Sequence, residues 1–120
     1  MLIRLDVSSA VPIFEQVAAS IRTDMAAGQL NPGDKLPSAR DVSASLGVNL
    51  HTVLRAYQAL RDEGLVDMRR GRGAVVTPAA GALTDLIADI RHLGAKASAL
   101  GIAPDALAAL VRDIVASGPE

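Results

Sequence analysis

The chain has 120 residues, which suits one domain or one small domain with an appendage. Half of the residues are hydrophobic, two are aromatic and none is cysteine, which excludes disulfides, thiolate metal sites and cysteine nucleophiles. The formal net charge is −1, so no overall positive field attracts a polyanion. Neither an apolar run long enough to span a membrane nor a signal peptide is recognisable, so we expect a cytoplasmic protein with no membrane partner.

The first predicted helix covers residues 12–27. Pro12 is a favourable first helical residue because its missing N–H would be unpaired there. Apolar residues then recur every three to four positions, which places them on one helical face. Gly28 suits a left-handed conformation after the last turn. The sequence Asn-Pro-Gly-Asp at 31–34 predicts a turn.

Two shorter helices follow, joined by a turn that contains glycine. Ser38 can cap a helix that runs to about Leu46. Asn49 can cap a third helix over about 50–63, and Gly64 ends it. Such a pair is a helix-turn-helix. Its second helix is expected to bury Val53, Ala56, Tyr57 and Leu60.

A basic hairpin is predicted after the third helix. The β-rich runs 65–68 and 74–77 lie on either side of Arg-Arg-Gly-Arg-Gly at 69–73. Three helices and such a hairpin form a winged helix-turn-helix. The segment 35–77 holds seven basic and four acidic residues and is the only basic block, so it is where a polyanion partner would bind.

The composition changes at Pro78, where alanine becomes frequent. We therefore expect a winged helix-turn-helix domain over 1–77 and a helical appendage over 78–120, in a mostly α fold with a small β-hairpin. Helical periodicity covers about 82–99, and a last helix begins at Pro104 or Asp105. Two short amphipathic helices cannot bury each other fully, so they must pack on the first domain or on a second chain.

Several motifs follow one another in a familiar order. They are Pro-Ile-Phe-Glu-Gln-Val at 12–17, Gly28 to Arg40 with Pro-Gly-Asp-Lys-Leu-Pro-Ser at its centre, Leu-Gly-Val at 46–48, Arg-Ala-Tyr at 55–57, Glu-Gly-Leu-Val at 63–66 and Arg-Gly-Arg-Gly at 70–73. This order resembles the GntR family of bacterial transcription regulators over about 12–76, and the short two-helix tail resembles its YtrA-like branch. The resemblance implies a sequence-specific regulator, more often a repressor, that binds double-stranded operator DNA as a homodimer.

The resemblance places the DNA contacts on three segments. They are Lys35, Ser38 and Arg40; Asn49, Leu50, His51, Thr52 and Arg55 at the start of the third helix; and Arg69, Arg70, Gly71 and Arg72 in the wing. For three of these residues an alternative to DNA contact stays open: Asn49 could serve only as a helix cap, His51 could be an ordinary surface histidine, and Arg55 could pair with a helix carboxylate. Many relatives carry arginine at 50 and 54, whereas this chain has Leu50 and Leu54, which we expect to be exposed and to offer apolar contacts.

The resemblance also implies that the tail serves dimerisation, because an operator with two-fold symmetry needs a symmetric reader. The apolar positions assigned to that interface are Leu83, Leu86, Ile87, Ile90, Leu93, Leu107, Leu110, Val111 and Ile114.

Other classes of function are less well supported. A winged-helix protein–protein interaction module is the alternative, and the basic wing argues against it. We expect no enzyme, catalytic residue, metal or cofactor, because no nucleophile–base pair, metal cluster or phosphate loop is recognisable. A small-molecule effector stays open, since a cleft between tail and winged domain could hold one although no polar cluster marks it.

Overall fold

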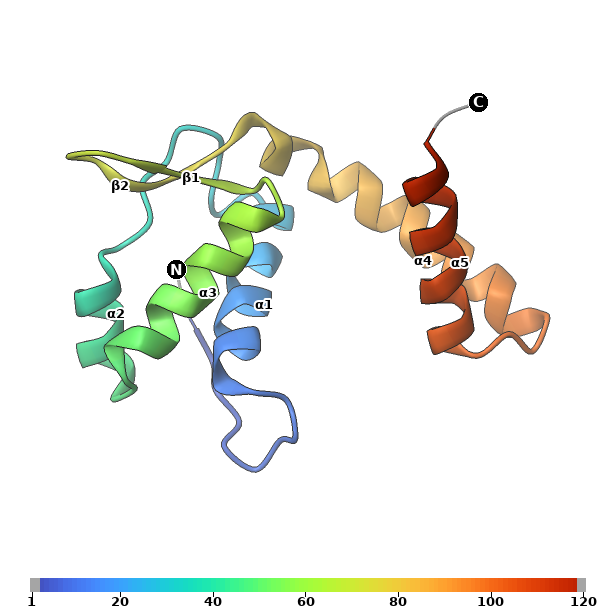
Figure 1. Cartoon of the computed structure of the whole chain (residues 1–120), viewed down its shortest axis with the longest axis horizontal. Helices are drawn as coiled ribbons and strands as arrows, with labels where there is room; N and C mark the ends of the chain where they lie inside the picture. Colours follow the sequence, from blue (N-terminus) through green and yellow to red (C-terminus); the bar gives the residue numbers. More distant parts are fainter. Residues whose placement is uncertain (1–2, 119–120) are drawn as a thin grey trace. The chain divides into compact units, whose positions relative to one another are not determined.

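The computed structural model describes residues 3–118, which contain five α-helices, one short 3₁₀ helix and a two-stranded antiparallel hairpin (Figure 1). The helices are α1 (Ile13–Ala26), α2 (Ala39–Leu46), α3 (Leu50–Asp62), η1 (Pro78–Ala82), α4 (Leu83–Ala99) and α5 (Pro104–Ser117), and the strands are β1 (Val66–Arg69) and β2 (Gly73–Val76). The predicted mostly helical fold with one hairpin is confirmed.

Two compact units divide the chain after Thr84. In the first unit, η1 packs on α1 and buries Ala80, and the Thr84 hydroxyl donates to the carbonyl of Ala26 at 2.6 Å. The segment 78–84, which the composition places in the tail, therefore packs on α1 of the first unit. Leu83, expected at a dimer interface, lies partly against the core of the first unit because η1 returns the chain to α1.

Side-chain caps begin both helices of the helix-turn-helix, as predicted. The Ser38 hydroxyl accepts a backbone N–H three residues later at 3.1 Å, and the Asn49 side-chain oxygen accepts one two residues later at 2.8 Å. Gly47 ends α2 with a φ of 67°, a left-handed conformation that glycine adopts at least cost. Pro12 is the N-cap of α1 rather than its first helical residue, because its ψ of 146° is extended.

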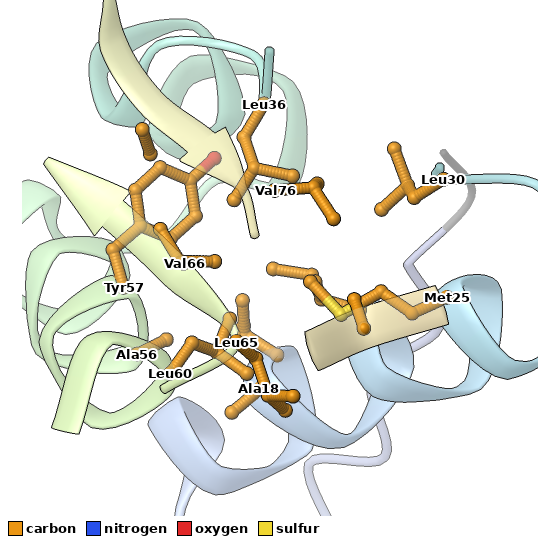
Figure 2. Close-up of a cluster of buried hydrophobic side chains, with 14 of the residues drawn as sticks. Ala18, Met25, Leu30, Leu36, Ala56, Tyr57, Leu60, Leu65, Val66 and Val76 are labelled. Atoms are coloured by element: carbon orange, nitrogen blue, oxygen red, sulfur yellow. The ribbon is translucent and has the colours of Figure 1, made fainter. Parts of the chain in front are cut away.

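One face of α3 lies at the centre of the core of the first unit. Val53, Ala56 and Leu60 of α3 have no exposed surface, and neither do Val17 and Ile21 of α1. Each fully buried large aliphatic side chain contributes about 1.5–3 kcal/mol, so this packing determines how α3 is oriented on α1. The hairpin and the loop before α2 complete the cluster with Leu36, Leu65, Val66, Ala74 and Val76 (Figure 2).

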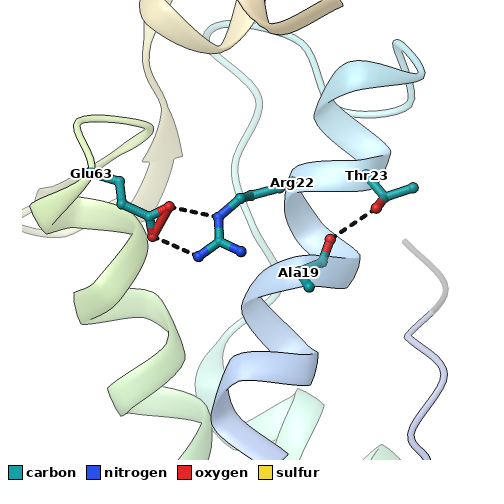
Figure 3. A network of polar contacts seen from close by, with 4 residues as sticks. All are labelled: Ala19, Arg22, Thr23 and Glu63. Carbon is teal, nitrogen blue, oxygen red and sulfur yellow. Dashed lines mark hydrogen bonds and ion pairs between the residues drawn. The ribbon is translucent and has the colours of Figure 1, made fainter. Parts of the chain in front are cut away.

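An ion pair joins α1 to the residue that follows α3. The Nε and Nη2 atoms of Arg22 donate to the two carboxylate oxygens of Glu63 at 2.6 and 2.7 Å (Figure 3). Both side chains are more than a third exposed, so the pair contributes at most about 1 kcal/mol. Its bidentate geometry nevertheless favours one position of this end of α3 on α1.

A hydrogen bond from α3 holds the turn before α2. The Tyr57 hydroxyl donates to the carbonyl of Pro37 at 2.7 Å, next to the capping residue Ser38. Tyr57 is 2% exposed, and burial raises the pKa of its hydroxyl to about 12. The predicted core position of Tyr57 is confirmed, and its hydroxyl also links the two helices of the helix-turn-helix.

The titration of Tyr57 tests this burial directly, because it is the only tyrosine in the chain. As the pH rises, tyrosinate absorbance should increase with a midpoint at about pH 12 in the folded protein and at about pH 10 in urea. The unfolded chain then loses its proton first, so the stability linked to Tyr57 is complete below pH 10 and is lost as the pH rises towards 12. A folded-state midpoint near 10 would show that the hydroxyl is solvated.

Replacing the hydroxyl tests the hydrogen bond. Tyr57→Phe leaves the Pro37 carbonyl without its partner, so the free energy of unfolding in urea at neutral pH should fall by about 1–2 kcal/mol. The variant should also lack the part of the alkaline loss of stability that comes from Tyr57. An unchanged free energy of unfolding would mean that water replaces the hydroxyl at no cost.

Candidate nucleic-acid interface

The first turns of α3 present polar side chains on the side opposite the core. His51 and Arg55 are exposed and lie one helical turn apart, and Thr52 is half-buried beside them. Asn49 is exposed as well, and while its oxygen caps α3 its amide NH₂ remains a donor. The start of α3 thus combines hydrogen-bond donors with the positive end of the helix dipole.

A shallow groove of about 370 Å³ lies between the start of α3 and the start of α1. It is lined by Ile13, Phe14, Asn49, His51, Thr52 and Arg55. Four of the predicted contact residues therefore share one surface feature. The sequence analysis missed the two α1 side chains, because their helical spacing is that of ordinary core residues and only the tertiary fold brings the two helix starts together.

Arg55 contacts an aromatic ring. Its guanidinium carbon lies 3.9 Å from the centroid of the Phe14 ring, which is a cation–π contact. Among residues 3–118 Arg55 forms no ion pair, so the alternative in which it pairs with a helix carboxylate is wrong.

The two leucines of α3 are less exposed than expected. Leu50 and Leu54 are both half-buried, which corrects the prediction of two freely exposed apolar side chains. The reason is their place on the helix: Leu50 lies three residues before Val53, and Leu54 lies three before Tyr57, so both flank the buried face. They offer a partly accessible apolar edge beside His51.

The wing is a short hairpin with a cationic tip. Arg69 pairs with Gly73 across the hairpin, and the tip turns at Gly71, whose φ of 79° is left-handed. Arg69 lies 3.3 Å from the carboxylate of Asp67, so part of its charge is offset. Arg70 and Arg72 are exposed and, within the described chain, neither forms an ion pair.

Lys35 extends this cationic surface. The backbone of residues 33–36 pairs with β2 through a bridge between Lys35 and Val75, with Leu36 N–H donating to the Ala74 carbonyl at 2.8 Å. This pairing puts the Lys35 side chain beside Gly73, where an added Cβ would lie 3.7 Å from the lysine Cε. Lys35 is thus a neighbour of the wing, which the linear sequence does not show.

Two further predicted residues begin α2. Ser38 uses an oxygen lone pair as the helix cap, which leaves its hydroxyl proton free to donate. Arg40 is exposed in the first turn of the helix and forms no ion pair in the described part of the chain. The groove lining includes neither of these residues nor the wing.

Across residues 3–118, no three histidine, aspartate or glutamate side chains gather in a way that could hold a metal ion. No helix in this range is long and apolar enough to cross a membrane.

Comparison with known proteins gives the family. The pattern of the bacterial regulatory proteins of the gntR family matches residues 13–76. The transcriptional repressor YtrA of Bacillus subtilis is 37% identical over 76 residues, which are 63% of this chain and 58% of that protein. The aligned segments span 58% to 64% of the length of the first curated relatives, all of which carry the names of transcriptional regulators rather than of enzymes.

Solved structures give the same fold. YtrA from Sulfolobus acidocaldarius, a GntR-family transcription factor, is 38% identical, covers 78% of this chain and 99% of its own, and has a TM-score of 0.63. AraR(DBD) in complex with operator ORR3 is 25% identical, covers 64% of this chain and 95% of its own, and has a TM-score of 0.52. The predicted winged helix-turn-helix fold is confirmed.

Proposed function

The chain belongs to the gntR family of bacterial regulatory proteins, DNA-binding regulators of transcription, and we propose that it is a homodimeric repressor that reads an inverted-repeat operator. The observation that carries this proposal is the start of α3, where His51, Thr52 and Arg55 face away from the core beside a groove. The repressor assignment is supported by the name of the Bacillus subtilis relative, and the DNA partner by the operator complex of AraR(DBD). A regulator of this kind would act in the cytoplasm.

In this proposal α3 enters the major groove. The N-terminal residues of a recognition helix reach the base edges there. His51 and Arg55 supply donors for base edges or phosphates, and the methyl group of Thr52 can contact a thymine methyl. Asn49 caps α3 and offers its amide to a phosphate, and Leu50 adds apolar contact at the edge of the helix.

The other basic residues would bind the DNA backbone and the minor groove. Arg70 and Arg72 have no intramolecular ion pair within the described residues, so DNA binding would not have to break one. Gly71 allows the tip to approach the DNA closely. Arg69 and Lys35 extend the same surface, and Ser38 with Arg40 would donate to phosphates from the start of α2.

Of the expected tail over 78–120, the part after Thr84 would hold two copies together, while the first unit binds DNA. In the second compact unit, α5 has no buried residue, and an apolar groove of about 620 Å³ lies between α4 and α5. Such exposed apolar area in a small unit is typical of an interaction surface. The exposed apolar side chains of the second unit include Leu86, Ile90, Leu93, Leu110, Val111 and Ile114. Ile87 and Leu107 of the same unit are half-buried.

Selection from a random pool of DNA duplexes tests the proposal. A dimeric reader should enrich an inverted repeat, with half-sites about one helical turn apart or a multiple of it. Weak, salt-sensitive binding with no enriched sequence would contradict sequence-specific recognition.

The wing makes a quantitative prediction about salt. If Arg72 contacts a phosphate, Arg72→Ala should weaken binding to all sequences and make the plot of log affinity against log salt shallower by about one unit. Arg91→Ala removes the same charge from the exposed side of α4 and should leave the slope unchanged. An unchanged slope for Arg72→Ala would remove Arg72 from the set of contacts.

The start of α3 makes a prediction about base preference. His51→Ala should change which base is preferred at one position of each half-site, because each good base contact discriminates by about 1–3 kcal/mol. Asp62→Asn, at the opposite end of α3, should leave the preference unchanged. Equal losses of affinity on all operator variants would show that His51 contacts only the backbone.

The tail makes a prediction about assembly. Ile90→Asp places a charge in the apolar groove and should convert the dimer to monomer in sedimentation, with a loss of operator affinity of at least about tenfold. Ala95→Asp adds the same charge to the opposite face of α4 and should leave the dimer intact. A dimer that survives Ile90→Asp would place the interface elsewhere.

A further inference from the structure

We infer that Phe14 is a positioning residue for Arg55: its ring, on α1, holds the guanidinium at the start of the recognition helix before DNA binds. The inference rests on the proposed function, in which Arg55 contacts DNA. It assigns a role in recognition to α1, a helix that carries none of the predicted contact residues.

The contact is between the Phe14 ring, which is fixed by packing, and the exposed guanidinium of Arg55. Phe14 is half-buried and packs against the core of the first unit, so the position of its ring is determined by the fold. Arg55 is exposed, and its guanidinium carbon lies 3.9 Å from the ring centroid. The chain has only one other aromatic residue, Tyr57, which is buried and whose hydroxyl donates a hydrogen bond to the carbonyl of Pro37. No second ring can therefore replace Phe14.

The contact leaves Arg55 able to bind. Attraction to the face of a ring uses the positive charge of the guanidinium, and no carboxylate in the described chain occupies its N–H donors. Those donors lie beside His51 and Thr52 in the same groove. Arginine has many rotamers, and ordering them opposes binding. Because the Arg55 side chain is already ordered over Phe14, part of its rotamer entropy is lost during folding rather than during DNA binding.

The coupling between the two residues is measurable as affinity for the duplex that the wild-type protein selects from the random pool. Phe14→Leu keeps an apolar side chain but has no aromatic face, so it should weaken binding about two- to fivefold. Phe14→Tyr keeps the face and should bind like the wild type. In an Arg55→Gln background, Phe14→Leu should have no further effect. Ile21→Val, a change of packing on the buried face of α1 outside the groove, is the matched control and should bind like the wild type.

A second readout needs no DNA. The Arg55 side-chain N–H resonance should be displaced by the ring current of Phe14 in the free protein. The displacement should disappear in Phe14→Leu and remain in Phe14→Tyr and Ile21→Val. A general loss of packing would not follow this order of variants.

Four results would overturn the inference. The first is equal weakening by Phe14→Leu with Arg55 and with Gln at position 55, which would show that Phe14 acts through packing alone. The second is unchanged affinity in Phe14→Leu, and the third is the absence of a ring-current displacement at Arg55. If the wild type binds its duplex and Arg55→Gln binds equally well, the proposed function stands and this inference fails. If the wild type selects no duplex, the proposed function itself fails.

Discussion

The packing of α3 determines which of its side chains the first unit presents to solvent. One face supplies Val53, Ala56 and Leu60 to the core, so the helix cannot rotate without exposing them. The opposite face is thereby presented to solvent at a defined orientation. Two contacts reinforce this orientation. Phe14 forms a cation–π contact with Arg55 near the start of α3, and Arg22 forms an ion pair with Glu63 just after the end of α3. A helix held this way can present the same side chains to every DNA site that it meets.

The positive charge of this protein is concentrated in one segment, although the net charge of the whole chain is negative. A net charge of −1 argues against binding to any polyanion at random, yet the basic block contains an exposed wing whose Arg70 and Arg72 form no ion pair among the described residues. Asp67 offsets part of the charge of Arg69 at 3.3 Å, so the arginines of the wing are not equivalent. Lys35 joins them through backbone pairing with β2. The basic surface is thus assembled by folding from two separate segments of the chain.

The sequence was informative where structure depends on neighbours along the chain. The caps Ser38 and Asn49 follow local rules, and the structure has them where we predicted. Tertiary contacts could not be predicted in the same way. The partial burial of Leu50 depends on how α3 lies against the rest of the core, and the packing of Leu83 depends on η1 turning back to α1. Contacts with DNA and with a second copy depend on the partner molecule as well, so rules that act along one chain do not determine them.

The most direct test of the central claim is to map the DNA-binding surface on the intact protein by NMR. Backbone amide signals would be followed while the selected duplex is added to isotope-labelled protein. We predict the largest changes at residues 49–55 and 69–72, with α1 perturbed mainly near Phe14. Changes confined to residues 85–118, with α3 and the wing unaffected, would contradict this prediction.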